Sequence, residues 1–157
     1  MKAGGYVVLV RHASTDAGVG DPKGFKVEDC STQRNLNQRG RKEAERLGAE
    51  FKKRGIPIAK IMSSRWCRCL ETARIAFDNA EPWAALDNTF DKPERRELQM
   101  REIRGALAKP ITGGNIVLVT HGVNIGALTG LYPAPAELIV VEPGVKLNAV
   151  GRIAIDP

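Results

Sequence analysis

The chain of 157 residues is poor in several residue types, and each shortage excludes a class of function. Aromatic residues make up 5% of the sequence, which is too few to suggest a surface that stacks nucleic-acid bases. The three cysteines, Cys30, Cys67 and Cys69, cannot supply the four ligands of a structural zinc site. No apolar stretch approaches the roughly 20 residues of a membrane span. We therefore expect neither a nucleic-acid partner nor a membrane partner.

The cysteines leave their own pairing open. Cys67 and Cys69 should point to different sides of a helix, so they are not expected to bond to each other. We expect three free, partly buried thiols. The alternative, in an oxidising compartment, is a disulfide between Cys30 and one of the other two.

Positive charge is the one excess, with a formal net charge of +6. Much of it lies within residues 39–54, where arginines and lysines alternate with glutamates. This alternation is typical of a solvated helix face rather than of a nucleic-acid footprint. The charge still favours phosphates and other anions as ligands.

Apolar and polar segments alternate in an α/β pattern, and the length indicates a single domain over residues 1–157. We expect a three-layer α/β/α sandwich with a mostly parallel central sheet. Asn37 is the predicted N-cap of the first helix, and Ser63-Ser64 that of the second. The expected helices are 38–54, 65–78, 93–108 and 123–130. The expected strands are 6–10, 58–62, 83–86 (weakly signalled), 115–120, and two edge strands at 137–142 and 147–155.

The only two histidines stand at the same kind of place. His12 follows the apolar run Tyr6–Val10 and Arg11, and His121 follows the run Ile116–Val119 and one threonine. Such short β-branched runs are typical of buried parallel strands. Ligands of open α/β sheets bind beyond the carboxyl ends of the strands. Two histidines at that edge, one beside an arginine, predict an anion site.

Phosphoryl transfer is the chemistry that these residue types suit best. A neutral imidazole is a nucleophile towards phosphorus, and a planar guanidinium binds two phosphate oxygens at once. Arg68 adds a second arginine in the first turn of the second helix, where the helix dipole also favours anions. At about 4 Å and an effective dielectric constant of about 20, one such charge pair contributes roughly 4 kcal/mol. Arg11, Arg68 and a histidine can therefore hold a phosphate without a metal.

Four motifs, in order on predicted strand ends and helix starts, resemble the histidine phosphatase superfamily with its phosphoglycerate mutase-like fold. The resemblance spans residue 6 to about residue 130. The motifs are Arg11-His12-Ala13, the Ser63-Ser64…Arg68…Thr72-Ala73 pattern, His121-Gly122, and the stretch Leu36–Ala44, which is similar to the first-helix signature of the family.

The resemblance implies a role for each matched residue and no cofactor or metal. His12 would be the nucleophile and form a phosphohistidine, which water then hydrolyses. The other implied contacts to the phosphoryl group come from Arg11, Arg68, His121 and the backbone at Gly122, and from the hydroxyl of Thr15, with the Ser14 hydroxyl beside it.

The chain departs from the family pattern at the proton donor. Many members place a glutamate after the third strand, and here Asp87 occupies that region. We expect Asp87 to be the donor, with Asp91 as the second candidate and an aspartate that only solvates the surface as the alternative. Arg34, in the loop that should border the cleft, either contacts substrate or is a plain surface arginine. Without a clear donor, a good leaving group such as that of phosphohistidine or an acyl phosphate is favoured.

The long insertions that shape a mutase pocket are missing, so we expect a phosphatase with an open site. Its substrate would be a phosphorylated small molecule, a glycan phosphate or a phosphoprotein. The alternatives are a non-catalytic phosphate-binding domain of the same fold and, less favoured, a mutase. Met1–Gly5 lacks the pattern of a signal peptide, which predicts a cytoplasmic protein. The start of the chain and its cysteine motifs are also similar to exported bacterial members, so a removed leader would make it periplasmic.

Overall fold

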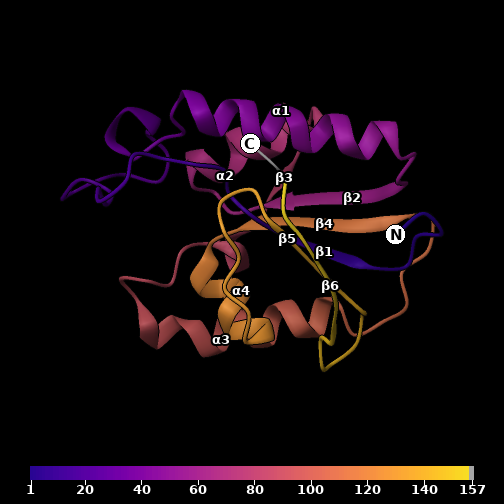
Figure 1. Ribbon diagram of the computed structural model, residues 1–157. Helices are drawn as coiled ribbons and strands as arrows, with labels where there is room; N and C mark the ends of the chain where they lie inside the picture. The colour runs from indigo at the N-terminus through magenta and orange to yellow at the C-terminus, as the bar shows by residue number, and fades with distance from the viewer. Residues whose placement is uncertain (156–157) are drawn as a thin grey trace.

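In the computed structural model, which describes residues 1–155, a six-stranded sheet is covered by helices on both faces (Figure 1). No helix in this part of the chain is both long and apolar enough to cross a membrane. The strands are β1 (Val7–Arg11), β2 (Ile58–Ser63), β3 (Glu81–Pro82), β4 (Asn115–Thr120), β5 (Leu138–Val141) and β6 (Ala149–Ile153). The α-helices are α1 (Gln38–Lys53), α2 (Cys67–Phe77), α3 (Pro93–Ala106) and α4 (Gly122–Thr129).

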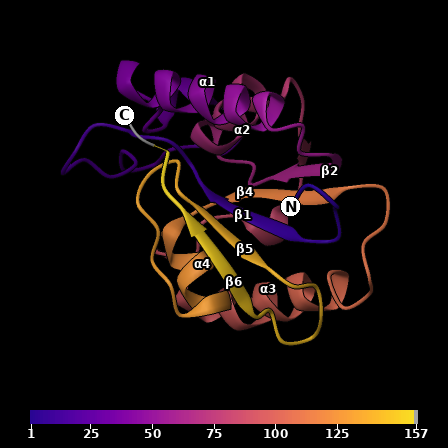
Figure 2. The same ribbon diagram turned by 45° about the vertical axis from the view of Figure 1, so that its right-hand side comes forward.

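The sheet has the strand order β3-β2-β4-β1-β5-β6. The pairings from β3 through to β1 are parallel, whereas β5 runs antiparallel to both β1 and β6. Helices α1 and α2 lie on one face, and α3 and α4 lie on the other (Figures 1 and 2). The predicted three-layer sandwich with a mostly parallel sheet is confirmed.

Strand β1 is buried on both faces, which explains its unbroken apolar sequence. Val8 and Val10 pack into the core under α1 and α2, where Phe51 also lies. Val7 and Leu9 pack into the second core, under α3 and α4. These four of the five β1 residues have no exposed surface. The central strand is therefore held from both sides, and its end is fixed in space.

The register of β1 against β4 sets the position of both histidines. Arg11 is paired with Thr120, and the next backbone N–H, that of His12, donates to the Thr120 carbonyl at 2.9 Å. His12 and His121 therefore leave neighbouring parallel strands at the same level. The expectation that both reach the carboxyl edge of the sheet is confirmed.

Helix α1 begins as predicted at Asn37, whose Oδ1 accepts from the Gly40 N–H at 2.9 Å. Gly40 also permits a close approach, because a Cβ there would lie 2.1 Å from the carbonyl oxygen of Ser14. The glycine lets the first turn of α1 pack directly onto the chain that leaves β1.

Helix α2 starts later than predicted. Its first residue is Cys67, and Trp66 holds the N-cap position without a side-chain cap bond. Ser63 and Ser64 therefore do not cap the helix as expected. The Ser64 hydroxyl contacts His121 instead, with Oγ 2.9 Å from Nε2. From local sequence, a serine between a strand and a helix predicts a helix cap. Here the Ser64 hydroxyl makes a contact with His121, across the site, instead of a cap.

Two strand predictions were also wrong. The third strand is only Glu81–Pro82, and the segment Ala84–Leu86 is a 3-10 helix rather than a strand. Strand β5 is not at an edge, because it lies between β1 and β6 with all four residues buried. The apolar pattern of a segment does not show which other strands it will pair with in the sheet.

The expectation of three free thiols was wrong, and the alternative pairing holds. Cys30 lies in a 3-10 helix (Cys30–Thr32) of the long loop after β1, and it forms a disulfide with Cys67. Cys69 is free and buried. The disulfide fastens the loop to the first residue of α2. Local sequence could not decide this, because the pairing depends on how a loop of more than twenty residues folds back over the sheet edge.

Reduction of the Cys30–Cys67 disulfide should lower the free energy of unfolding by about 2–4 kcal/mol, because the bond links residues 37 apart and restricts the unfolded chain. Urea denaturation of oxidised and dithiothreitol-reduced protein measures the difference. The double variant Cys30→Ser/Cys67→Ser is the control and should be equally stable with and without reductant. Equal stability of the two wild-type forms would contradict this role of the disulfide.

Candidate active site

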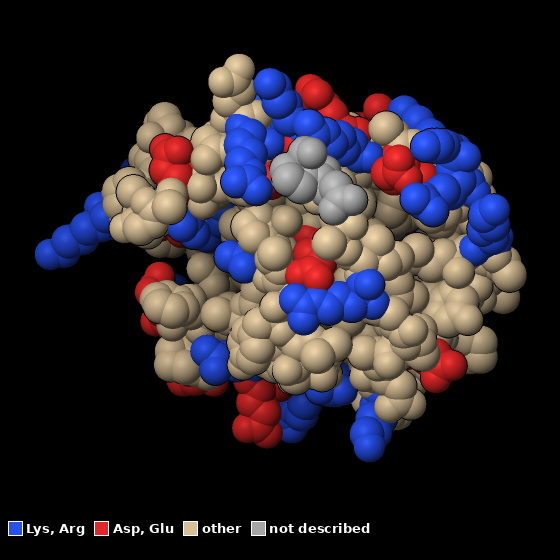
Figure 3. Space-filling model, in the orientation of Figure 1, with Lys and Arg blue, Asp and Glu red and all other residues tan. Residues whose placement is uncertain are grey.

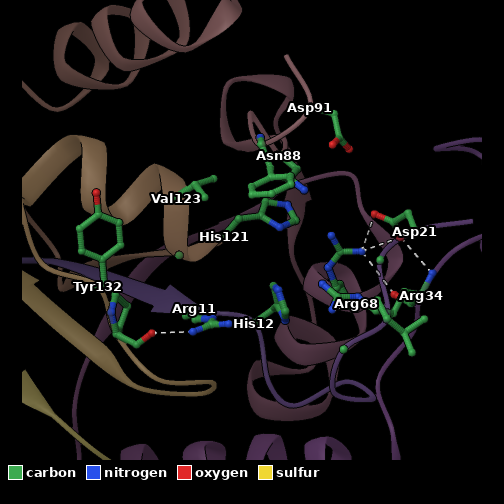
Figure 4. Close-up of a pocket in the computed structure, with 16 residues that line it drawn as sticks. Arg11, His12, Asp21, Arg34, Arg68, Asn88, Asp91, His121, Val123 and Tyr132 are labelled. Carbon is green, nitrogen blue, oxygen red and sulfur yellow. Dashed lines mark hydrogen bonds and ion pairs between the residues drawn. The ribbon is translucent and has the colours of Figure 1, made fainter. Parts of the chain in front are cut away.

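A cavity of about 560 Å³ opens at the carboxyl ends of β1 and β4. Figure 3 shows the molecule hollowed on the left, between the segment before α1 and the α3–α4 layer, with basic side chains in the hollow. Lysines and arginines also gather over α1 at the top of that view. Seven of the candidate site residues line the cavity, namely Arg11, His12, Arg34, Arg68, Asp91, His121 and Gly122. Figure 4 labels all of them except Gly122.

His12 is held as a neutral imidazole with one nitrogen available. Its Nδ1 lies 2.8 Å from the carbonyl oxygen of Ala13, and since a carbonyl only accepts, Nδ1 carries the proton. The unprotonated nitrogen is then Nε2. Burial, followed by the positive charge of Arg68, lowers the pKa of His12 from 6.5 to about 3. The nucleophilic form is therefore present at neutral pH without a general base.

His121 lies at the N-cap position of α4, beside His12. The ring centroids of the two histidines are 5.4 Å apart, with an angle of 68° between the planes. The ring of Trp66 meets His121 edge-on from another side, at 5.7 Å. Burial and then the neighbouring His12 lower the pKa of His121 well below its usual value. The pair is neutral in the empty site, and the positive charge of the site comes from arginine.

Three arginines converge on the cavity with unused donors. Arg11 donates from Nη1 to the carbonyl of Pro133 at 2.8 Å, and Arg34 donates from Nη1 to the carbonyl of Val19 at 2.6 Å. Within residues 1–155, the Nε atoms of Arg11, Arg34 and Arg68 are buried and have no hydrogen-bond partner. A buried donor without a partner is costly, so three of them around one cavity indicate a site built for an anion.

Ser14 and Thr15 do not lie where the resemblance suggested. The carboxylate of Glu43 accepts from both the backbone N–H and the hydroxyl of Ser14, each at 2.9 Å. Thr15 forms a backbone bridge with Leu36. Neither residue lines the cavity. The chain turns towards α1 directly after Ala13, so both hydroxyls leave the sheet edge.

Asp87 is also outside the cavity lining, although it is close to the site. Its carboxylate accepts from the Arg65 side chain and from the Arg65 backbone N–H, and it lies 3.4 Å from the Ser64 hydroxyl. Ser64 in turn contacts His121. Asp87 therefore reaches the site from behind His121. Asp91, the second candidate for the donor, lines the cavity.

Sequence reasoning missed Asp21, Trp66 and Thr72. Thr72 accepts from the Ala13 N–H at 3.1 Å and so ties the end of β1 to α2. Asp21 lines the cavity and bonds to Arg68. One aspartate in a glycine-rich loop carries no local signal. The threonine belonged to the motif around Arg68, but its partner at the end of β1 could not be read from the spacing.

In residues 1–155, no three histidine, cysteine, aspartate or glutamate side chains gather in a group that could hold a metal ion. The acidic groups of the cavity are Asp21 and Asp91, which face its three arginines. The arrangement can bind a dianion through guanidinium groups and present the Nε2 atom of His12 to it.

Because both histidines are neutral in the folded protein, we predict that its free energy of unfolding falls in mild acid. Their folded pKa values lie below the unfolded value of about 6.5, so protons bind the unfolded chain first as the pH drops. The contribution of His12 is complete well above pH 6.5 and falls as the pH decreases towards 3, and that of His121 falls in the same direction. We expect His12 to cost about 2 kcal/mol of unfolding free energy between pH 7.5 and pH 5, and His121 to act in the same direction. Urea denaturation across this range measures the slope, which His12→Gln should reduce. A flat profile for the wild type would contradict the neutral pair.

The sequence model of the histidine phosphatase superfamily (branch 1) matches residues 7–105, which is more than half of the chain. Comparison with curated proteins finds no match. Three solved structures share the fold at low identity. The protein histidine phosphatase SixA, complexed with tungstate, is 14% identical and has a TM-score of 0.68 over 95% of this chain and 96% of its own.

The other two structures are of proteins that are named for different activities. Phosphoglycerate mutase from Thermus thermophilus is 17% identical, with a TM-score of 0.67 over 96% of this chain and 99% of its own. A mycobacterial glucosyl-3-phosphoglycerate phosphatase in complex with VO3 is 19% identical, with a TM-score of 0.60 over 88% of this chain and 92% of its own. These likenesses show the phosphoglycerate mutase-like fold. Together with the family match, which covers the motifs from Arg11 to Ala73, they indicate an enzyme of the phosphatase or phosphotransferase kind, and the chain belongs to the histidine phosphatase superfamily.

Proposed function

We propose that the protein is a metal-independent phosphatase that hydrolyses a phosphomonoester or phosphohistidine through a phosphohistidine on His12. The observation that carries the proposal is the meeting of a neutral His12, with Nε2 free, and three unpartnered arginine Nε atoms in one cavity. The first supplies a nucleophile, and the second supplies positive charge for the oxygens of a phosphoryl group.

The reaction has two displacements at phosphorus. In the first, the Nε2 lone pair of His12 forms the P–N bond while the bond from phosphorus to the leaving group breaks. Arg11, Arg68 and His121 hold the phosphoryl oxygens, and Gly122 packs beside Arg11 at the same wall. In the second, water attacks phosphorus and the P–N bond breaks, so that its electron pair returns to Nε2. One proton of the water stays on the released inorganic phosphate, and the other passes to the carboxylate that protonated the leaving group, or to solvent where no donor was needed. His12 returns to its starting form.

Asp91 is the proton donor that this proposal favours for leaving groups that need one. It lines the cavity, whereas the Asp87 carboxylate is held by Arg65. The other carboxylate of the cavity, that of Asp21, is bonded to Arg68, and its pKa is below the ordinary value. A group held ionised in this way is a poor acid.

The mouth of the cavity supports a leaving group larger than a small metabolite. Phe90 and Tyr132 line it, and they are 70% and 69% exposed, which is unusual for large aromatic side chains. Val19 in the loop after β1 adds a third exposed apolar group. A glycan phosphate or a phosphorylated protein segment would cover these side chains, and a smaller phosphorylated molecule would leave them in solvent. Of the structural neighbours, one is named as a protein histidine phosphatase, which agrees with a phosphorylated protein segment, and another as a glucosyl-3-phosphoglycerate phosphatase, whose named substrate is a small phosphorylated molecule.

The catalytic role of His12 is tested with 4-nitrophenyl phosphate in the presence of a chelator. Wild type should turn the substrate over, and His12→Ala should lose at least about a thousandfold in kcat, because the nucleophile is removed and the second histidine of the cavity, His121, has its Nε2 in contact with the Ser64 hydroxyl. His12→Ala with wild-type turnover would refute the mechanism.

A panel of sugar phosphates, phosphohistidine peptides and other metabolite phosphates then separates the alternatives. Binding of phosphate or vanadate without hydrolysis of any member would favour a non-catalytic domain. Transfer of phosphate between substrate hydroxyls, dependent on a bisphosphorylated primer, would favour a mutase.

The donor is tested by comparing leaving groups. Asp91→Asn should lower kcat/KM for an alkyl phosphate by about a hundredfold, because general acid catalysis contributes on this order. It should change kcat/KM for 4-nitrophenyl phosphate less than about threefold, since that phenolate leaves unprotonated. Glu94→Gln, a nearby acid outside the cavity lining, is the matched control. Equal losses on both substrates would contradict the assignment.

A further inference from the structure

The loop after β1 places a carboxylate against Arg68 inside the cavity. Both oxygens of Asp21 accept from the Arg68 Nη1 atom, at 2.9 and 3.1 Å. The two side chains are 6% and 1% exposed, so this is a buried ion pair. In Figure 4, Arg68 lies between the histidines and Asp21. Asp21 therefore lies on the side of Arg68 that is away from the two histidines.

The pairing uses one side of the guanidinium and leaves the other. Nη1 takes the bonds to Asp21 and a weaker one to the Arg34 carbonyl, at 3.3 Å. Nε finds no partner in the described part of the chain. A guanidinium binds an oxyanion best through two parallel N–H groups of one edge, and the edge that contains Nε is the one left available. Asp21 thus holds Arg68 by Nη1, while the edge that contains Nε makes no hydrogen bond from Nε within residues 1–155.

Asp21 is itself held firmly. It also accepts from the Trp66 indole Nε1 at 3.1 Å and from the Arg34 backbone N–H at 2.9 Å. Cys67, directly before Arg68, is fastened to the same loop by the disulfide and donates its N–H to Gln33 at 3.0 Å. The carboxylate is therefore a rigid reference for Arg68 and not a mobile surface group.

The charges around Asp21 favour its ionised form. Burial alone would raise the pKa of Asp21, but the hydrogen bonds from Arg68 and from the Arg34 backbone outweigh it and lower the pKa. Without this carboxylate, three arginines would share one cavity with only Asp91 to oppose them. An arginine left buried without a partner would turn away or draw in another anion.

We propose that Asp21 is a positioning residue of the phosphatase reaction, which holds Arg68 oriented for the phosphoryl group. The inference rests on the proposed function. The negative charge of Asp21 lies close to where the dianion binds, so it weakens ground-state binding of phosphate. The same carboxylate keeps Arg68 in the geometry that the transition state needs. These two effects have opposite signs in a variant that lacks the charge.

The test is Asp21→Asn, measured for kcat and KM with 4-nitrophenyl phosphate and for binding of inorganic phosphate by calorimetry. We expect kcat to fall about 10- to 100-fold, and phosphate to bind about 3- to 10-fold more tightly because the repulsion is gone. Asp16→Asn is the matched control, since Asp16 is exposed in the same loop and does not line the cavity. It should change neither quantity.

A second variant keeps the proposal open to refutation if Asp21→Asn does not fold. Asp21→Glu retains the charge but displaces Arg68, so kcat should fall without tighter phosphate binding. An unchanged kcat in either folded variant would overturn the proposal. Weaker phosphate binding in Asp21→Asn, together with a lower melting temperature, would show that Asp21 only anchors the loop.

Failure of the role proposed for Asp21 can be distinguished from failure of the proposed function. If the wild type hydrolyses nothing, the proposed function fails and no kcat can be compared. Calorimetry then decides, because tighter phosphate binding in Asp21→Asn and unchanged binding in Asp21→Glu still support the arrangement, whereas unchanged binding in Asp21→Asn overturns it.

Discussion

The pairing of β1 with β4 is the constraint on which the rest of the site depends. A parallel register that joins Arg11 to Thr120 brings the two histidines of the chain to one level at the sheet edge. Since side chains alternate between faces, a slip of one residue would turn every β1 side chain to the other layer. Both faces of β1 are apolar, so this alternation alone does not fix the register. Bonds to side chains at its two ends do so, from the Tyr6 N–H to Asn115 and from the Ala13 N–H to Thr72, and they thereby align the two histidines.

The charged and polar groups of the cavity are arranged so that they can bind a dianion. The histidines are buried and neutral, the arginines carry unused donors, and Asp21 balances Arg68 from behind. Burial makes each of these interactions stronger than it would be in water, and it makes an unpaired donor expensive. In the proposed reaction, a phosphoryl group accepts hydrogen bonds from the arginines and balances their charge. Preorganised groups of this kind favour the transition state because they need little rearrangement as the reaction proceeds.

The sequence predicts the parts of the site that local pattern controls. Strand ends, helix starts and the cap at Asn37 follow from apolar periodicity and turn residues, so His12, His121, Arg11 and Arg68 could be placed at one edge. Contacts across the loop after β1 could not. Asp21 and the Cys30–Cys67 disulfide depend on how that loop folds back onto α2. For Asp87, local sequence was misleading. Its position after the third strand predicted a proton donor, but its carboxylate is bonded to the Arg65 side chain and does not line the cavity.

The central claim is that His12 carries the phosphoryl group between the two displacements. The direct measurement is mass spectrometry of peptides from enzyme quenched in base during turnover of 4-nitrophenyl phosphate, because phosphohistidine survives base and is lost in acid. We predict one phosphoryl group, on His12, which disappears after acid treatment. Turnover without any phosphorylated peptide, or with the phosphoryl group on another residue, would contradict it.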